Sequence, residues 1–180
     1  ALLAWAEAQS SWIIEDDYDS EYRYDGSPLT ALAGLDRQQR VIYAGTFSKL
    51  LFPMLRLGYL VVPSNLIGTF QIARNVVDLT TPLVSQRVLA EFIAEGHFTR
   101  HIRRTRTIYA HRRAYLLAAL QQHLGNDIEV IPTDTGMHLT ILLPQGVHDV
   151  DIAQQAYAHN ISLTPLSSLS LVPLTQGGLV

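Results

Sequence analysis

The chain has 180 residues with a formal net charge of −3, and 48% of its residues are hydrophobic. This composition is typical of a globular protein and excludes a disordered or strongly basic nucleic-acid-binding chain. The absence of cysteine excludes disulfides, thiolate catalysis and cysteine-based zinc sites. Because no apolar run approaches the ~20 residues of a membrane span, we expect no membrane partner and a cytoplasmic location.

The first part of the chain predicts helix, strand and loop in turn. Residues 1–9 have helical character, and an apolar run over 11–14 that ends in three acids predicts a buried strand. Glycine and proline among polar residues predict a loop over 19–37. Further apolar runs over 40–45 and 57–62 predict two strands. All three strands are apolar on both faces, which is typical of a sheet covered by helices.

Helices dominate the middle of the chain, and a smaller mixed region follows. The capping signals Ser64-Asn65, Pro82, Gly96 and Gly125-Asn126 indicate boundaries of three helices. They predict helices over 64–74, 83–95 and 98–123. Beyond them the pattern changes to strand, strand, helix and strand, over 128–131, 137–143, 150–159 and 161–164.

These elements predict an α/β fold in two parts joined by a helix. We expect 1–96 to be the C-terminal part of a large domain with a mostly parallel sheet and helices on both faces. Residues 97–125 would be a long connecting helix, and 126–180 would be a small, truncated α+β lobe. The helical start and the strand-like end over 177–180 suggest that both ends are cuts within a longer protein.

Reactive side chains follow the first two predicted strands. Glu15-Asp16-Asp17-Tyr18 ends the first strand, and Lys49 comes shortly after the second. Ligands of open α/β sheets bind beyond the carboxyl ends of the strands, so we expect Asp16, Tyr18 and Lys49 to converge there. Lys49 is the single lysine beside twelve arginines. Lys49 is therefore the one side chain of this sequence that could form an imine with a carbonyl compound.

Pyridoxal phosphate chemistry calls for this set of groups. A lysine amine forms an imine with the aldehyde, and a carboxylate keeps the pyridine nitrogen protonated so that the ring accepts electrons. A phenol donates a hydrogen bond to the 3-oxygen, and hydroxyls with an arginine neutralise the phosphate. Thr46, Ser48 and Arg56 flank Lys49 at suitable spacings. Clustered carboxylates also bind hard cations, but no acid follows at calcium-loop spacing, so we expect no metal site.

Three segments, 13–24, 43–49 and 52–59, carry a family resemblance. They resemble the aminotransferase-like domain of MocR/GabR regulators of the GntR superfamily, which is a fold type I, pyridoxal-phosphate-dependent domain. The resemblance covers the whole chain and is sharpest over 13–63. It implies that Lys49 is the catalytic residue that holds the cofactor. The other implied cofactor-binding residues are Asp16 at the pyridine nitrogen, Tyr18 at the 3-oxygen, and Thr46, Ser48 and Arg56 around the phosphate.

Two spacings favour a regulator over an ordinary transaminase. The broader aminotransferase pattern has its aspartate three residues before the tyrosine, where this chain has Glu15, whereas the regulators match Asp16. Arg56 follows Lys49 by seven residues, and not by the usual eight. The resemblance also implies a homodimer, a small amino compound as effector, and DNA contact only through an N-terminal domain that is absent from this chain.

Three functions are therefore open. The first is the effector-sensing domain of a MocR-type regulator, in which an amino compound displaces Lys49 from the cofactor. The second is a class I/II aminotransferase with Lys49 as general base, and the third is a remnant that binds no cofactor. His138 is a weak substrate-side candidate. DNA contact is an alternative role for arginines over 100–113, although packing of their stems on apolar surface is the stronger expectation.

Overall fold

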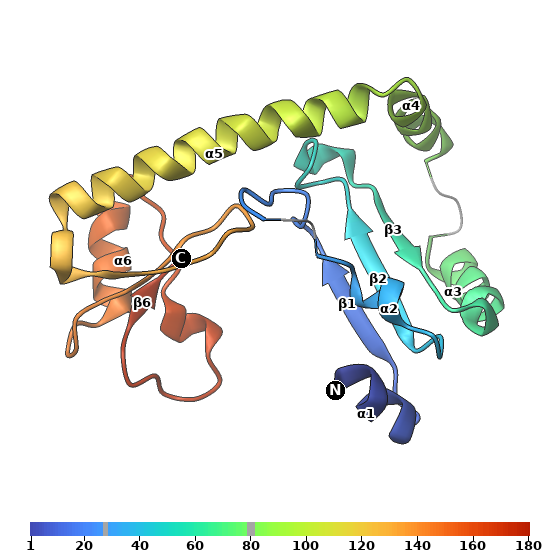
Figure 1. Ribbon diagram of the computed structural model, residues 1–180, viewed down its shortest axis with the longest axis horizontal. Coiled ribbons are helices and arrows are strands. Elements are labelled where there is room, and N and C mark those ends of the chain that lie inside the picture. Colours follow the sequence, from blue (N-terminus) through green and yellow to red (C-terminus); the bar gives the residue numbers. More distant parts are fainter. Residues whose placement is uncertain (27–28, 79–81) are drawn as a thin grey trace. The chain divides into compact units, whose positions relative to one another are not determined.

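The computed structural model describes residues 1–26, 29–78 and 82–180. The chain divides into two compact units, Ala1–Arg106 and Thr107–Val180, which are described separately. Helix α5 (His97–His123) contributes residues to both units (Figure 1). The division falls within the segment predicted as the connecting helix. In the described part of the chain, no helix combines the length and apolarity needed to cross a membrane.

A three-stranded sheet forms the base of the first unit. Its strands are β1 (Ile13–Asp17), β2 (Val41–Thr46) and β3 (Gly58–Val61), in that order across the sheet (Figure 1). β1 and β2 are parallel, and β3 is antiparallel to β2. Because parallel strands end at the same edge of a sheet, the segments that follow β1 and β2 start side by side.

The helices of the first unit are α1 (Leu2–Ala8), α2 (Leu32–Leu35), α3 (Ile67–Asp78) and α4 (Leu83–Ala94), with 3₁₀ turns η1 (Pro53–Leu55) and η2 (Ser64–Leu66). Helix α4 agrees with its predicted bounds to within one residue, whereas the helix predicted over 64–74 is η2 followed by α3, which ends at Asp78. Pro82 precedes α4, and Gly96 follows it with φ of +72°. Glycine adopts this left-handed conformation without strain, so the chain can leave the helix at Gly96.

Two predictions for this unit are wrong in detail. The segment 19–37 was expected to be a loop, but it contains α2, whose N–H groups at Leu32 and Ala33 donate to the Glu15 carboxylate. This cap comes from a distant strand, so the local sequence gives no sign of it. β3 was expected to be buried, yet Leu60 is 53% exposed, whereas Val41 of β2 is 4% exposed. β2 lies between two strands, and β3 is an outer strand of the described sheet.

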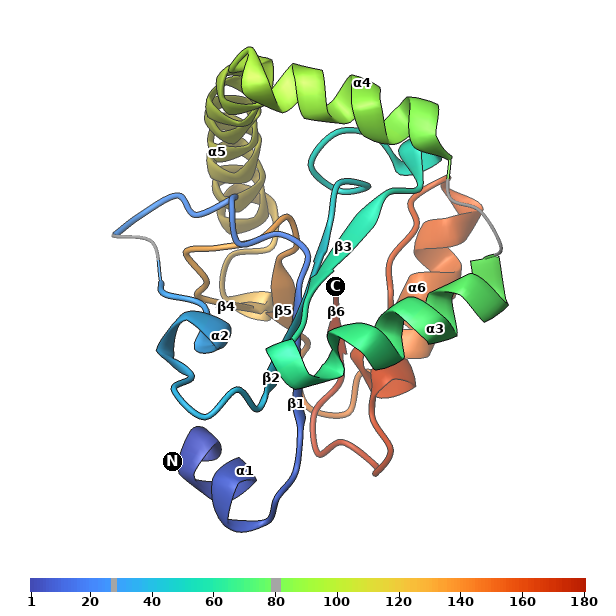
Figure 2. The same ribbon diagram turned by 90° about the vertical axis from the view of Figure 1, so that its right-hand side faces the viewer.

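The second unit contains a smaller, antiparallel sheet. Its strands are β4 (Glu129–Ile131), β5 (Thr140–Leu142) and β6 (Gly178–Leu179), in that order, with α6 (Asp149–Ala158) and the 3₁₀ turns η3 (Gly125–Asp127) and η4 (Leu166–Leu169) (Figure 2). The core consists of Leu143, Ala153 and Leu179. It therefore joins α6 to the sheet.

The strand predicted over 161–164 is absent. Thr164 exchanges both backbone hydrogen bonds with Val180, at 3.0 and 2.9 Å, and Pro165 makes a single bridge with Leu179. Proline has no N–H group to continue a ladder, so the pairing stops after one point. The prediction recognised the apolar pattern but missed the effect of Pro165 on strand pairing.

A buried carboxylate holds the second unit together. Asp149 at the start of α6 accepts hydrogen bonds from the Ser167 N–H (2.9 Å), the Ser167 hydroxyl (2.7 Å) and the Gly178 N–H (3.2 Å). Burial by itself would raise the pKa of Asp149, but these donors outweigh burial and the pKa is lowered from its ordinary 3.8. The ionised carboxylate therefore stabilises the contact of α6 with η4 and β6 above that pH, and this stability is lost as the pH falls below it.

We expect Asp149→Ala to destabilise the second unit by about 3 kcal/mol at pH 7, because three donors lose their acceptor in a buried place. Backbone hydrogen exchange in α6 and β6 of the intact protein would measure this loss. Asp151→Ala is the matched control, because Asp151 lies in the same first turn but is exposed. Equal exchange rates in the two variants would contradict the prediction, as would a wild-type protein with no loss of protection below pH 3.8.

Candidate functional site

The three consecutive acids at the end of β1 have different surroundings. Glu15 accepts the N–H groups of α2 at 2.7 and 2.8 Å. Asp17 accepts hydrogen bonds from the Tyr43 hydroxyl at 2.7 Å and the Ser20 hydroxyl at 2.8 Å. Asp16 is exposed and has no hydrogen bond or ion pair within residues 1–26, 29–78 and 82–180. Two of the acids therefore support the fold, and one carboxylate is available for a ligand.

Strand geometry separates these acids into two groups. Side chains alternate along a strand, so Asp16 lies on the face opposite to Glu15 and Asp17. The parallel register pairs Asp16 with Ala44, and Thr46 is the next β2 residue on the same face. Tyr18 follows directly after β1 and is exposed. Asp16, Tyr18 and Thr46 thus lie at the carboxyl ends of the two parallel strands.

The opposite face of the sheet is occupied by a packed aromatic cluster. Burial raises the pKa of the Tyr43 phenol, and its hydrogen bond to Asp17 raises it further, so the phenol stays protonated and donates. The Tyr43 and Tyr59 ring centres are 6.0 Å apart. A Cβ atom on Gly45 would lie 2.4 Å from the Tyr59 ring, so this packing requires glycine. Asp17 is therefore part of this cluster.

Lys49 lies in a tight turn after β2. The Thr46 hydroxyl oxygen accepts the Ser48 N–H at 3.1 Å, and the Leu51 N–H donates to the Phe47 carbonyl at 2.9 Å. These bonds hold the backbone on both sides of Lys49. The Lys49 side chain itself is exposed, and within the described residues it has no partner. The turn therefore presents a free amine on a well-held backbone.

Arg56 lies beside this turn because of the pairing between β2 and β3. The Phe47 N–H donates to the Leu57 carbonyl at 3.0 Å, and Thr46 pairs with Gly58. Arg56 has a left-handed backbone with φ of 51° and ψ of 34°. Non-glycine residues rarely adopt this conformation, and such residues often cluster at functional sites. The guanidinium is exposed and has no partner among the described residues.

The six predicted site residues lie at one edge of the first sheet. Asp16 and Tyr18 come from the end of β1, Thr46, Ser48 and Lys49 from the end of β2 and its turn, and Arg56 from the segment before β3. Hydroxyls, an amine, a carboxylate and a guanidinium suit a ligand that carries a carbonyl, a basic nitrogen and a phosphate. His138 lies in the second unit, so its role stays a prediction.

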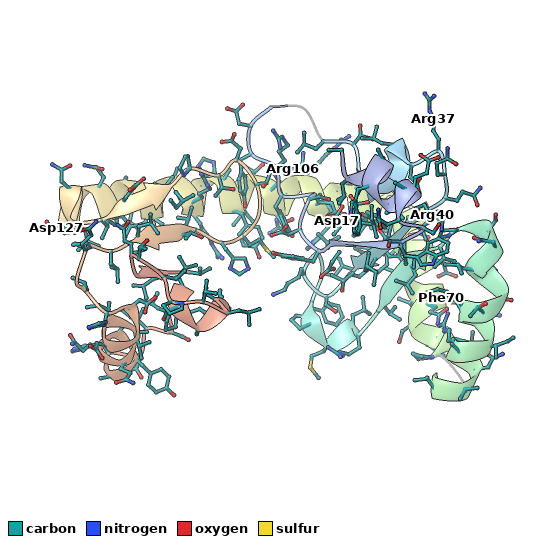
Figure 3. All side chains as sticks on the ribbon, turned by 90° about the horizontal axis from the view of Figure 1, so that it is seen from below. Asp17, Arg37, Arg40, Phe70, Arg106 and Asp127 are labelled. Carbon is teal, nitrogen blue, oxygen red and sulfur yellow. The ribbon has the colours of Figure 1, made fainter. Side chains whose placement is uncertain are left out.

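Several arginines of α5 make intramolecular contacts. The Arg106 Nε–H donates to the Glu21 carbonyl at 2.9 Å. Arg106 is labelled in Figure 3. Arg113 donates to the Thr133 carbonyl, and the Arg112 guanidinium lies 6.0 Å from the Tyr109 ring centre. The expected packing of the arginine stems on apolar surface stays a prediction. The sequence analysis missed His101, whose ring donates to the Leu50 carbonyl at 2.9 Å, because no local pattern links residues so far apart.

Comparison with known proteins identifies the class of protein to which this fold and these sheet-edge residues belong. The chain belongs to the aminotransferase class I and II family, whose model matches residues 1–176. The crystal structure of Pyrococcus horikoshii kynurenine aminotransferase in complex with PMP superposes with a TM-score of 0.90 at 29% identity, covering 99% of this chain and 45% of that one. The predicted fold class and cofactor class are thereby confirmed for the family.

Regulators are among the similar proteins. The chain is 42% identical to the uncharacterized HTH-type transcriptional regulator YhdI of Bacillus subtilis, over 92% of this chain and 35% of that protein. It is 40% identical to the probable rhizopine catabolism regulatory protein MocR of Rhizobium meliloti, over 92% of this chain and 34% of that protein. The predicted resemblance to MocR-type regulators is confirmed. The chain spans about a third of the length of these relatives.

Proposed function

We propose that this chain is the pyridoxal-phosphate-binding, effector-sensing part of a MocR-type transcription regulator. The observation that carries the proposal is a lysine on a well-held turn at the same sheet edge as a carboxylate, both without a partner among the described residues. Family membership supports the cofactor, and the similarity to HTH-type regulators supports the regulatory role. The DNA-binding segment of the proposed regulator lies outside this chain.

Each residue at the sheet edge has a role in this proposal. Pyridoxal phosphate supplies an aldehyde that bonds to primary amines and a ring that accepts electrons. Asp16 would hold a proton on the pyridine nitrogen, and Tyr18 would donate to the 3-oxygen. Thr46, Ser48 and Arg56 would bind the phosphate through two hydroxyls and a guanidinium fork. Each polar group of the cofactor would thus have a partner of suitable chemistry at the edge.

Lys49 would carry out the chemistry that senses the effector. Its amine would hold the cofactor through the aldehyde. The primary amine of an effector would compete with Lys49 for that aldehyde, and Lys49 would then regain both hydrogens as a free amine. Release of Lys49 would be the chemical signal that the effector has bound. The effector controls DNA binding only to the extent that it binds the two states of the regulator with different affinity.

Equilibrium binding of the intact polypeptide to DNA would test this function. We expect a primary amine that displaces Lys49 to change the DNA affinity by at least about five-fold. The bound cofactor's absorption spectrum would report displacement in the same titration, and an N-acetylated form of the same amine is the matched control. A spectral change without any change in DNA affinity would contradict the regulatory role.

A working aminotransferase is the second candidate, and the similarity to the kynurenine aminotransferase structure favours it. In that reaction Lys49 would also move a proton between carbon atoms as general base. The two functions can be distinguished by supplying the intact polypeptide with an amino acid and a keto acid together and measuring the number of turnovers per site. Many turnovers per site would establish the enzyme, whereas a single displacement of Lys49 would agree with the sensor.

A further inference from the structure

The first turns of α5 contact both chain segments that carry the candidate site residues. The His101 Nε2–H donates to the Leu50 carbonyl at 2.9 Å, directly beside Lys49. One turn later, the Thr105 hydroxyl oxygen accepts the Tyr22 hydroxyl at 3.4 Å, and Arg106 donates to the Glu21 carbonyl. The same stretch of helix therefore holds the turn after β2 and the segment after β1.

These contacts lie on a packed face of the helix. His101 and Thr105 are four residues apart and hence neighbours on one side of α5. Between them Ile102 is buried, and their partners Tyr22 and Leu50 are only 1% and 4% exposed. Phe98, one turn before Ile102, packs edge-on against Phe47 at 5.8 Å between ring centres. The chain segments next to Lys49 and Tyr18 thus rest on a common rigid support.

The hydrogen bond of His101 is more specific than packing. A carbonyl oxygen only accepts, so the proton lies on Nε2 and the ring orientation is defined. The bond holds the carbonyl of Leu50, the residue that directly follows Lys49, although His101 and Leu50 are far apart in the sequence. Because Leu50 is buried, removing the donor would leave this carbonyl short of a partner. The loop would then lose a directional restraint at the point where the amine is presented.

We propose that α5 is a clamp: it holds both chain segments that carry the cofactor site, the turn after β2 and the segment after β1. His101 is the positioning residue for Lys49. Thr105 and Arg106 hold the segment that follows Tyr18. The inference rests on the proposed function of Lys49. Helix α5 continues without a break to His123, in the second unit. A displacement of α5 would therefore move the turn that carries Lys49 and the segment that follows Tyr18 together.

Three variants of the intact protein test the clamp. His101→Leu removes the donor and keeps an apolar side chain, whereas His101→Gln keeps an amide N–H that can reach the carbonyl. His111→Leu is the matched control, because His111 is exposed on the same helix and has no partner among the described residues. We expect His101→Leu to weaken pyridoxal phosphate retention about five- to ten-fold. It should also shift the pH midpoint of the bound cofactor's absorbance, and His101→Gln should restore most of both.

A purely structural role for His101 predicts a different result. Both His101 variants would then lower the melting temperature while cofactor retention and absorbance stay as in wild type, and this outcome would overturn the clamp. Arg106→Gln extends the test if His101→Leu does not fold, because Arg106 is exposed and its loss leaves the packed face intact. A two- to three-fold weaker retention is expected there, and unchanged retention would count against the clamp. A wild-type protein that takes no cofactor at Lys49 would refute the proposed function itself.

Discussion

Lys49→Ala is expected to abolish covalent attachment of pyridoxal phosphate to this protein. The turn after β2 holds the backbone around Lys49 by hydrogen bonds of Ser48 and Leu51, and neither depends on the lysine side chain. The variant should therefore fold normally and lose only the amine. Without that amine no bond to the aldehyde carbon forms in this chain, because its other basic side chains are arginines and histidines.

Borohydride reduction followed by peptide mapping measures this effect. In the wild-type protein the pyridoxyl group should be found on Lys49, and in the variant the labelled fraction should fall by at least about 100-fold. Lys49→Arg is the control for charge, because guanidinium keeps the positive charge but forms no stable imine. A pyridoxyl group on a lysine elsewhere in the intact polypeptide, with Lys49 unlabelled, would refute the assignment.

Asp16→Ala is expected to reduce cofactor affinity by roughly 100-fold, because a protonated pyridine nitrogen would lose its carboxylate partner. Asp17→Ala is the matched comparison from the next residue. Its carboxylate accepts from Tyr43 and Ser20 on the other face of the sheet, so its loss should cost about 2 kcal/mol of stability and little affinity.

Spectrophotometric titration with the cofactor and urea unfolding of the same two variants separate the effects. The expected pattern is crossed: Asp16→Ala weakens binding at nearly unchanged stability, and Asp17→Ala does the reverse. If Asp17→Ala binds the cofactor more weakly than Asp16→Ala, the pairing carboxylate has been assigned to the wrong residue.

Most elements could be predicted from local patterns. The apolar runs located β1 and β2, and capping residues located α4 and α5 to within one residue, because both signals depend on neighbours in the sequence. The strand predicted over 161–164 failed for a local reason, Pro165, whereas the two failures in the first unit have non-local causes. α2 depends on a carboxylate from β1, and the exposure of β3 depends on its place at the side of the described sheet.

The candidate site divides in the same way. Its residue types, and the two parallel strands that bring Asp16 and Lys49 to one edge, follow from motifs in the sequence. The sequence left three neighbouring acids to choose from, and resemblance alone favoured Asp16. Only the tertiary structure separates them by contact, since Glu15 caps α2 and Asp17 binds Tyr43.

The sequence by itself determined the components of the candidate site. These are one lysine, a family motif around it and a sheet edge at which polar side chains gather. The tertiary structure decided which carboxylate stays free and which helix supports the lysine turn. The physical reason is distance along the chain. Periodicity and capping act within a few residues, whereas the contacts of Glu15 with α2 and of His101 with Leu50 form only when distant segments pack together.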